Sequence, residues 1–543
     1  MIKSFLKNNT AVVFGIPALY YLITTGLILP LYLPSYNTLG TDKAFFWKTN
    51  LKITLCLFAV SAVLYAVSLI VRLIAKEAPI FQVSSFSELK KTILPHEIWT
   101  VLFAICACVS YMLSARKDIA RIGETGWYIG AWQYVAMCLC VLVIGRTVMN
   151  GSLFTGTLLI SSFLVYEAGI VIDLVGKNLN IEGWDVSKMS TIGNGNWFCG
   201  YLVCVLFVPA AVYMTAGNKS SKNSDAVRVF CLVHFFVSAY CFFSQGSASA
   251  YPATLAVFII LLIHAGREMD KLINIAELSV SFAAGGLFHA VAVKAGVYER
   301  ANDSVTKFLD GPVFLLFLLA ASVIIMLVLR KKRDAGCKTT NVHIGRIAAI
   351  ALGSLLAVYI LTVAVNTACG GFLGTGPVFY FGEKWASSRG MTITAGLTLF
   401  GGMTFKEKIF GIGPDVFYSL IYSGRFPALA EKMTEYFGGA RLTNAHCEPV
   451  TMLVNTGLAG TVCFYGMLVS LFKETFGAAG RKLSVKVSDK GYRAAVLAAA
   501  LGIAAYMINN IFSFQTAMNL SQLSLLAGFG ASAVRGLSET EDK

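Results

Sequence analysis

The sequence predicts an all-α fold, a polytopic transmembrane helical bundle of about 12 to 14 spans with one large extracytoplasmic loop that contains short amphipathic helices. Of its 543 residues, 56% are hydrophobic and only 13% are charged, whereas soluble domains contain about 25% charged residues. Apolar runs long enough to cross about 30 Å of hydrocarbon as helices recur along the chain. One longer and more polar stretch, residues 367–450, interrupts them.

The apolar runs define the expected elements in order. The first run has no small-residue cleavage site after it, so we expect a retained membrane helix rather than a signal peptide. Because most connections are short, we expect a single integral membrane domain over 1–543. It divides into N-terminal spans in 1–190, central spans in 190–366, an extracytoplasmic catalytic loop in 367–450 and C-terminal spans in 451–543. The fourteen candidate spans lie at about 11–32, 51–71, 97–114, 130–148, 153–173, 197–215, 227–243, 252–265, 272–292, 312–329, 346–366, 451–472, 492–509 and 517–534.

The distribution of Lys and Arg predicts the orientation. If the N-terminus is cytoplasmic, the inner loops hold more basic residues than the short outer loops, so the positive-inside rule favours two cytoplasmic termini. The net charge of +15 is then mainly a topology signal. A nucleic-acid partner is not expected, because the charges are spread over many short loops. The inner basic residues include Arg72, Lys76, Lys90, Lys91, Arg330, Lys331, Lys332, Arg333, Lys473, Arg481, Lys482, Lys486 and Lys490.

The chain contains 13 cysteines. Most fall within or beside predicted spans, where Cys behaves as a small hydrophobic residue. No CxxC motif or His/Cys spacing typical of a metal site occurs, so we predict no metal and no cofactor. Cys369 and Cys447 both fall in the large loop and could pair, but two free thiols are the favoured expectation.

Two segments predicted to lie outside the membrane break the pattern of short connections. Residues 176–196 end in Gly and Asn residues that favour a turn before the next span. The loop at 367–450 is too long to lack helices or a function of its own. Within it, the apolar spacing over 415–436 predicts two short amphipathic helices along the membrane surface, broken at Gly424 and Pro427. These helices would either roof a cavity that opens to lipid or only pack on the bundle.

The large loop also concentrates basic and titratable side chains. Arginine holds phosphate well, because its planar guanidinium donates two parallel hydrogen bonds and stays protonated. A neutral histidine can take a proton from a hydroxyl at physiological pH. Phosphate-binding groups and one base together suit group transfer from a diphosphate-linked lipid. These residues are Lys384, Arg389, Lys406, Lys408, Arg425, Arg441, His446 and Glu448.

One motif in the loop is more specific. It consists of His446, Cys447, nine residues, Gly457, two residues and Gly460. This order resembles the signature of the O-antigen ligase and O-antigen polymerase superfamily, which has His, then Asn, Ser or Gln, nine residues, Gly, two residues and a small residue. Glu448 falls where many members also have Glu, whereas Cys447 departs from the pattern.

Three further segments resemble motifs of the same superfamily, in the same order. Residues 190–196 (STIGNGN) are similar to its Ser-Thr-x-Gly-Asn-x-Asn, residues 388–390 (SRG) to its Arg-Gly pair, and residues 411–417 (GIGPDVF) to its Gly-x-Gly-Pro-Asp-x-Phe. The resemblance covers roughly residues 190 to 535. The first five spans share only general hydrophobicity with the superfamily.

One feature of the superfamily is missing. In many relatives the outer turn between spans seven and eight carries Ser-Arg-Gly, whose Arg is implicated in holding the lipid diphosphate. Here the turn at 243–250 reads FSQGSASA and contains no arginine. Backbone amides of this turn, or Arg425 or Arg441 of the large loop, are the alternatives that could replace it.

The resemblance implies a membrane glycosyltransferase that polymerises or ligates a surface polysaccharide on the outer face of the bacterial plasma (inner) membrane. The expected donor is an undecaprenyl-diphosphate-linked glycan, and the acceptor is a glycan or another molecule. The transfer would invert the anomeric carbon without a metal. Membrane lipids and a flippase or chain-length protein are the other expected partners.

The resemblance also implies roles for individual residues. His446 would orient or deprotonate the acceptor hydroxyl, Arg389 would stabilise the leaving diphosphate, and Glu448 is the third expected catalytic residue. The residues expected to bind substrate are Arg425, Arg441, Lys384, Ser247, Asn194, Asn196 and Asp415.

The rival interpretation is a transporter, such as a multi-span flippase of lipid-linked oligosaccharide or a proton-coupled carrier. Transporters often contain two similar halves with broken helices at matching positions, and no such repeat is visible here. Acidic residues within spans, Glu167, Asp173 and Glu277, would fit a proton relay. Since matching buried basic residues are not evident, we expect them to be neutral or paired within helices. His234 and His264 are expected to be structural.

Overall fold

The computed structural model describes residues 10–35, 38–74, 92–179, 190–216, 222–297, 304–481 and 489–541. Within these ranges the regular structure is helical, and the bridge that joins two described residues lies between Glu268 and Thr339. The predicted all-α class is therefore confirmed. The helices of the first half are α2 (Thr10–Tyr21), the π-helix η1 (Leu22–Ile28), α3 (Leu29–Leu31), α4 (Leu39–Ile74), α6 (Pro95–Leu113), α7 (Lys117–Ile122), α8 (Ala131–Arg146), α9 (Gly151–Leu179), α10 (Gly195–Val205), α11 (Val208–Thr215), α12 (Lys222–Ser244) and α13 (Ala250–Ala265).

The second half contains the remaining long helices and a group of short ones. They are α14 (Met269–Lys294), α15 (Ser304–Leu309), α16 (Pro312–Asp334), α17 (Ile344–Ala368), α18 (Trp385–Gly401), α19 (Phe405–Phe410), α20 (Phe417–Ile421), α21 (Pro427–Tyr436), α22 (Glu448–Asn455), α23 (Gly457–Ala479), α24 (Asp489–Asn509) and α25 (Ala517–Glu541).

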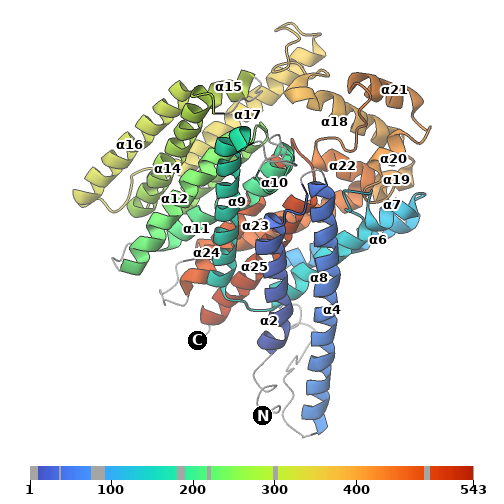
Figure 1. Ribbon diagram of the computed structural model, residues 1–543, viewed down its shortest axis with the longest axis horizontal. Coiled ribbons are helices and arrows are strands. Elements are labelled where there is room, and N and C mark those ends of the chain that lie inside the picture. The colour runs from blue at the N-terminus through green and yellow to red at the C-terminus, as the bar shows by residue number, and fades with distance from the viewer. Residues whose placement is uncertain are drawn as a thin grey trace.

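Ten described helices are long and apolar enough to cross a membrane, which fits a multi-pass membrane protein. The shorter apolar helices α8 and α13, together with α23 and α25, occupy the other predicted spans. α10, α11 and α24 are the most buried, whereas α16 and α17 are the most exposed of the ten. The start of α2 and the end of α25 lie at one end of the bundle, and α18 to α21 lie at the opposite end (Figure 1).

Two predicted spans are broken in the structure. The span predicted at 197–215 is divided into α10 and α11, and Pro209 lies in the first turn of the second helix, a position that proline tolerates. The span predicted at 451–472 is divided between α22 and α23. There Gly457 has a φ of 70°, and a Cβ on it would lie 2.4 Å from both the Gly411 nitrogen and the Ile409 carbonyl oxygen. Only glycine fits this approach.

The segment at 367–450 has a hydrophobic core of its own, separate from that of the bundle. The two helices predicted within 415–436 correspond to α20 and α21, and α21 begins at Pro427. Side chains of α7, Ile119 and Ala120, complete this second core. Its other buried members include Met391, Leu399, Phe417, Ile421, Met433 and Val454.

The expectation that Glu277 has no basic partner is wrong. Its carboxylate binds Arg228 of α12 at 3.1 Å and Arg330 of α16 at 2.6 Å. Both partners come from neighbouring helices, so the spacing within α14 does not reveal them. The side chain of Asp173 lies outside the described residues.

The predicted structural role of His234 and the predicted free thiols both fit the structure. His234 is buried and lies 2.9 Å from the Ser162 hydroxyl. All 13 cysteines are free. Cys369 is exposed and Cys447 is buried.

Candidate active site

Arg389 lies where several motif segments meet, directly after the left-handed residues 386–388 near the start of α18. Its Nε donates a hydrogen bond to the carbonyl oxygen of Phe512 (2.6 Å), and its Nη1 donates to that of Ala386 (2.9 Å). The guanidinium also acts electrostatically on His446 and Cys447, which precede α22. The structure therefore brings together the two residues, Arg389 and His446, that the sequence predicts to be central.

The turn that lacks the expected arginine lies on the same side of the molecule. A Cβ on Gly195, at the start of α10, would lie 2.8 Å from the Gln245 carbonyl oxygen, so the two segments touch. Cys199, one helical turn further along α10, has its sulfur 3.5 Å from the Ser249 hydroxyl. The charge of Arg389 acts on Cys199 as well. Arg389 is thus the arginine that lies near this turn.

Backbone strain marks this region. Non-glycine residues with φ between +20° and +160° are uncommon and persist where surrounding structure holds them, often at functional sites. Six of the seven such residues in the described ranges fall in the motif segments or directly before Arg389, and the seventh, Tyr128, is beside the pocket described below. They are Tyr128, Ser190, Ala386, Ser387, Ser388, Asp415 and His446.

His446 is held by its backbone and by an aromatic neighbour. Its φ is 47°, and its backbone nitrogen donates to the Asn444 side-chain oxygen at 2.9 Å. The imidazole meets the Phe514 ring edge-on, with ring centres 4.8 Å apart. Burial, together with the positive charge of Arg389, lowers the pKa of His446 from 6.5 to about 4. The imidazole is therefore neutral at pH 7 and can accept a hydrogen bond.

Glu448, the first residue of α22, is fully buried. Its carboxylate accepts hydrogen bonds from the Tyr506 hydroxyl (2.9 Å), the Gln515 amide (2.9 Å) and the Asn510 amide. Burial raises the pKa of Glu448 from 4.5 to about 7, against the opposing effect of these three donors. Near neutral pH this group can therefore both accept and release a proton.

Asp415 fixes the chain on the other side of the site. It has a φ of 61°, and one carboxylate oxygen accepts hydrogen bonds from the backbone nitrogens of Glu124 (2.8 Å) and Ile129 (3.5 Å). Burial raises the pKa of Asp415 from 3.8 to about 7. Its carboxylate holds the 124–129 segment in place, although the sequence predicts that it binds substrate.

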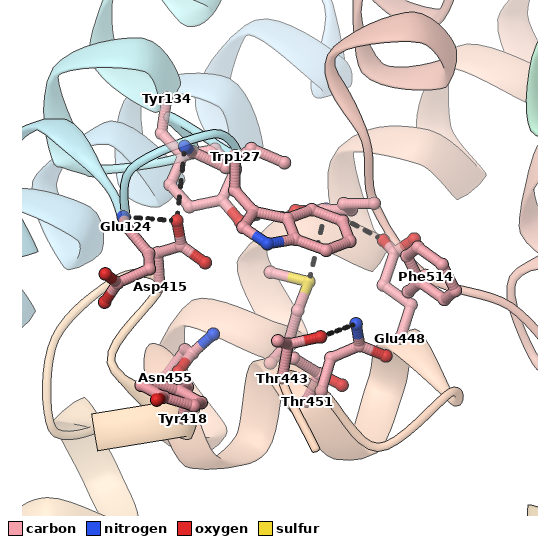
Figure 2. A pocket seen from close by; sticks show the side chains of 14 residues that line it. Glu124, Trp127, Tyr134, Asp415, Tyr418, Thr443, Glu448, Thr451, Asn455 and Phe514 are labelled. Atoms are coloured by element: carbon pink, nitrogen blue, oxygen red, sulfur yellow. Dashed lines mark hydrogen bonds between the residues drawn. The ribbon is translucent and has the colours of Figure 1, made fainter. Parts of the chain in front are cut away.

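A polar pocket lies between Asp415 and Glu448. Including the space that opens outward, it has a volume of about 560 Å³. Figure 2 shows Asp415 and Glu124 on one side, the Trp127 indole across the middle, and Glu448 and Phe514 on the other side. Carboxyl groups, amides and aromatic rings line this space, so it offers both hydrogen-bonding groups and apolar ring faces to a ligand.

An apolar groove includes Trp385, which lies shortly before Arg389 in the chain. It is lined by exposed α17 and by the start of α18, and has a volume of about 850 Å³. Trp385 lines the groove and donates a hydrogen bond from Nε1 to the Tyr359 hydroxyl at 3.3 Å. The Trp385 ring lies 6.2 Å from the ring of Phe512, whose carbonyl holds Arg389. The other lining residues are Ile360, Val363, Ala364, Thr367, Ala368 and Phe381.

Three predicted substrate-binding basic residues are not directly in the pocket. Arg425 forms a two-pronged ion pair with Glu407 (2.9 and 3.0 Å) and lines a separate depression. Arg441 donates to the Tyr418 hydroxyl at 2.6 Å, and Tyr418 lines the pocket, so Arg441 stands at its rim. Lys384 is exposed just before α18.

The remaining predicted substrate-binding residues, Asn194, Asn196 and Ser247, form hydrogen bonds within their own segments. The Asn194 side chain accepts a hydrogen bond from the Asn196 backbone nitrogen at 2.8 Å and caps α10, as Asn commonly does. Ser247 is buried, and its hydroxyl lies 2.9 Å from that of Ser249. Its backbone nitrogen donates to the Gln245 side chain at 2.6 Å. These contacts shape the turn next to Arg389.

Sequence reasoning missed the residues that hold Glu448. Tyr506 and Asn510 stand at the end of α24, and Gln515 follows them. The sequence does contain an indication of these residues. Asn509, Asn510 and Gln515 are polar side chains at the end of a long apolar run, where such residues are often functional.

Models of known protein families do not match this chain, and a search of curated proteins finds no match either.

Proposed function

We propose that this protein is a membrane glycosyltransferase that moves a glycan from a polyprenyl-diphosphate carrier to an acceptor hydroxyl. One observation carries the proposal. Arg389 binds the carbonyl oxygen of Phe512, whose ring packs near Trp385 of the apolar groove beside exposed α17. The charge of Arg389 also acts on His446, whose ring meets Phe514 in the wall of the polar pocket that Glu448 lines. A lipid-linked sugar has the same order of parts: an apolar chain, a diphosphate and a glycan.

In this mechanism the acceptor hydroxyl attacks the anomeric carbon on the face opposite the diphosphate. A new carbon–oxygen bond forms while the bond to the diphosphate oxygen breaks, so the configuration inverts. The hydroxyl donates a hydrogen bond to neutral His446, which orients it, and its proton passes to His446 or to Glu448. Glu448 is the better-matched acceptor near neutral pH, because its pKa is about 7.

Arg389 stabilises the negative charge that develops on the leaving diphosphate. Two of its nitrogen donors bind carbonyl oxygens, so the guanidinium is held in place before the substrate binds. A charge held in this way stabilises a transition state without the cost of reorienting the side chain.

The test is turnover in liposomes that contain the purified chain and a polyprenyl-diphosphate glycan, with the products measured by mass spectrometry. We expect His446→Ala to lower the rate by about 10² to 10⁴-fold. His343→Ala is the matched control, because His343 precedes α17 at the other end of the bundle. Undiminished turnover in His446→Ala would refute the assignment. Movement of intact donor between leaflets without bond cleavage would favour the transporter instead.

Polymerase and ligase activities use the same chemistry and differ in the acceptor. Deletion of the gene separates them. Loss of long surface chains with single repeats retained indicates a polymerase, whereas intact long chains left on the lipid carrier indicate a ligase.

A further inference from the structure

A second polar cavity lies at the other end of the bundle, between α12, α14 and α16. Its volume is about 730 Å³, including the space that opens outward. The polar side chains that line it include Tyr213, Arg228, Glu277 and Arg330. Figure 1 shows the three helices side by side at one edge of the bundle. The site proposed for glycosyl transfer uses none of these residues.

The charged groups that line the cavity are the guanidiniums of Arg228 and Arg330 and the carboxylates of Glu277 and Asp225. Glu277 uses one oxygen for Arg330 (2.6 Å) and the other for Arg228 (3.1 Å) and for the Tyr213 hydroxyl. One carboxylate is therefore shared by two guanidiniums. Asp225 is exposed and the Arg330 side chain is 43% exposed, so water screens both of these charges, whereas Glu277 is only 13% exposed.

One wall of the cavity is apolar and open to the surroundings. Val229 of α12 is 60% exposed, and Met326 of α16 lines the cavity one turn before Arg330. α16 is among the least buried of the long apolar helices. A recess that holds two guanidiniums and is bordered by exposed apolar helix surface has the form of a lipid headgroup site.

We infer that this cavity binds the phosphate headgroup of an anionic phospholipid from the leaflet at the end of the bundle that holds the termini. The phosphate lies against the guanidiniums of Arg228 and Arg330, and the acyl chains run along α12 and α16 past Val229 and Met326. Glu277 keeps the two guanidiniums in position when the lipid is absent. This site is independent of the proposed glycosyl transfer.

The test is native mass spectrometry of the full chain in neutral detergent, titrated with phosphatidylglycerol or phosphatidylcholine. Arg330→Gln removes one phosphate contact but leaves Glu277 paired with Arg228. Lys332→Gln is the matched control, because it removes the same charge from the same end of α16 outside the cavity. Met326→Trp fills the apolar wall and keeps every charge.

We expect the wild-type chain to prefer phosphatidylglycerol over phosphatidylcholine. Arg330→Gln and Met326→Trp should each weaken phosphatidylglycerol binding about fivefold, and Lys332→Gln should leave it unchanged. Equal binding of the two lipids, or equal weakening in Arg330→Gln and Lys332→Gln, would overturn the inference. Soluble glycerol phosphate should not displace the lipid, and displacement would assign the cavity to a free phosphate instead.

Discussion

The pH dependence of stability tests the environment of Glu448. Its pKa rises from 4.5 to about 7 on folding, so the folded chain binds this proton more tightly than the unfolded chain. The resulting stability is fully present below pH 4.5 and is lost as the pH rises through 7. The difference between the two pKa values corresponds to about 3 kcal/mol, at about 1.4 kcal/mol per unit. Glu448→Gln removes this contribution and keeps the side-chain shape.

The assay is unfolding by dodecyl sulfate in mixed micelles, with the free energy of unfolding measured below pH 4.5 and above pH 7. Relative to Glu448→Gln, the wild-type chain should lose about 3 kcal/mol between these two conditions. Asp415 also has a raised pKa, but it titrates in both proteins and cancels in the comparison. Glu431→Gln, which changes an exposed residue, should behave like wild type. A constant difference between wild type and Glu448→Gln would refute the reasoning.

Three further changes test the site and the fold. Arg389→Lys should lower turnover about 100-fold, because lysine cannot reproduce the planar fork, while Arg116→Lys, on a surface ion pair, should leave turnover unchanged. Trp385→Ala should raise the KM for the lipid-linked donor in liposome assays and leave kcat nearly unchanged, since it removes an apolar side chain that lines the groove. Gly457→Ala should destabilise the chain by about 3 kcal/mol in dodecyl sulfate unfolding, whereas Gly477→Ala, which adds a Cβ in open space, should be nearly neutral.

The long helices are predictable from the sequence because a membrane imposes a simple requirement. A spanning segment must be apolar and must satisfy its own backbone hydrogen bonds, and both properties can be read from consecutive residues. The break at Gly457 is of another kind, because it depends on close contact with residues 409–411. Helical periodicity contains no information about such a contact between separate segments.

The candidate site likewise contains residues that motif spacing predicts and contacts that only the folded chain shows. Motif spacing predicts Arg389, His446 and Glu448 as a group, and the structure brings Arg389 and His446 together with Glu448 beside them. The sequence does not show that Glu407 pairs with Arg425, although the two are close in the chain. The donors that surround Glu448 come from the end of α24, and only the folded chain places them there.

The second hydrophobic core has a consequence for how the protein is made. Ile119 and Ala120 belong to an early part of the chain, yet they pack in the same core as Phe417 and Met433. The ribosome synthesises Ile119 and Ala120 well before Phe417 and Met433. This surface of α7 therefore has no packing partner from the second core until late in synthesis. The core beneath the candidate site therefore forms only after most of the helices have been synthesised, and a chain that ends before residue 417 lacks this core.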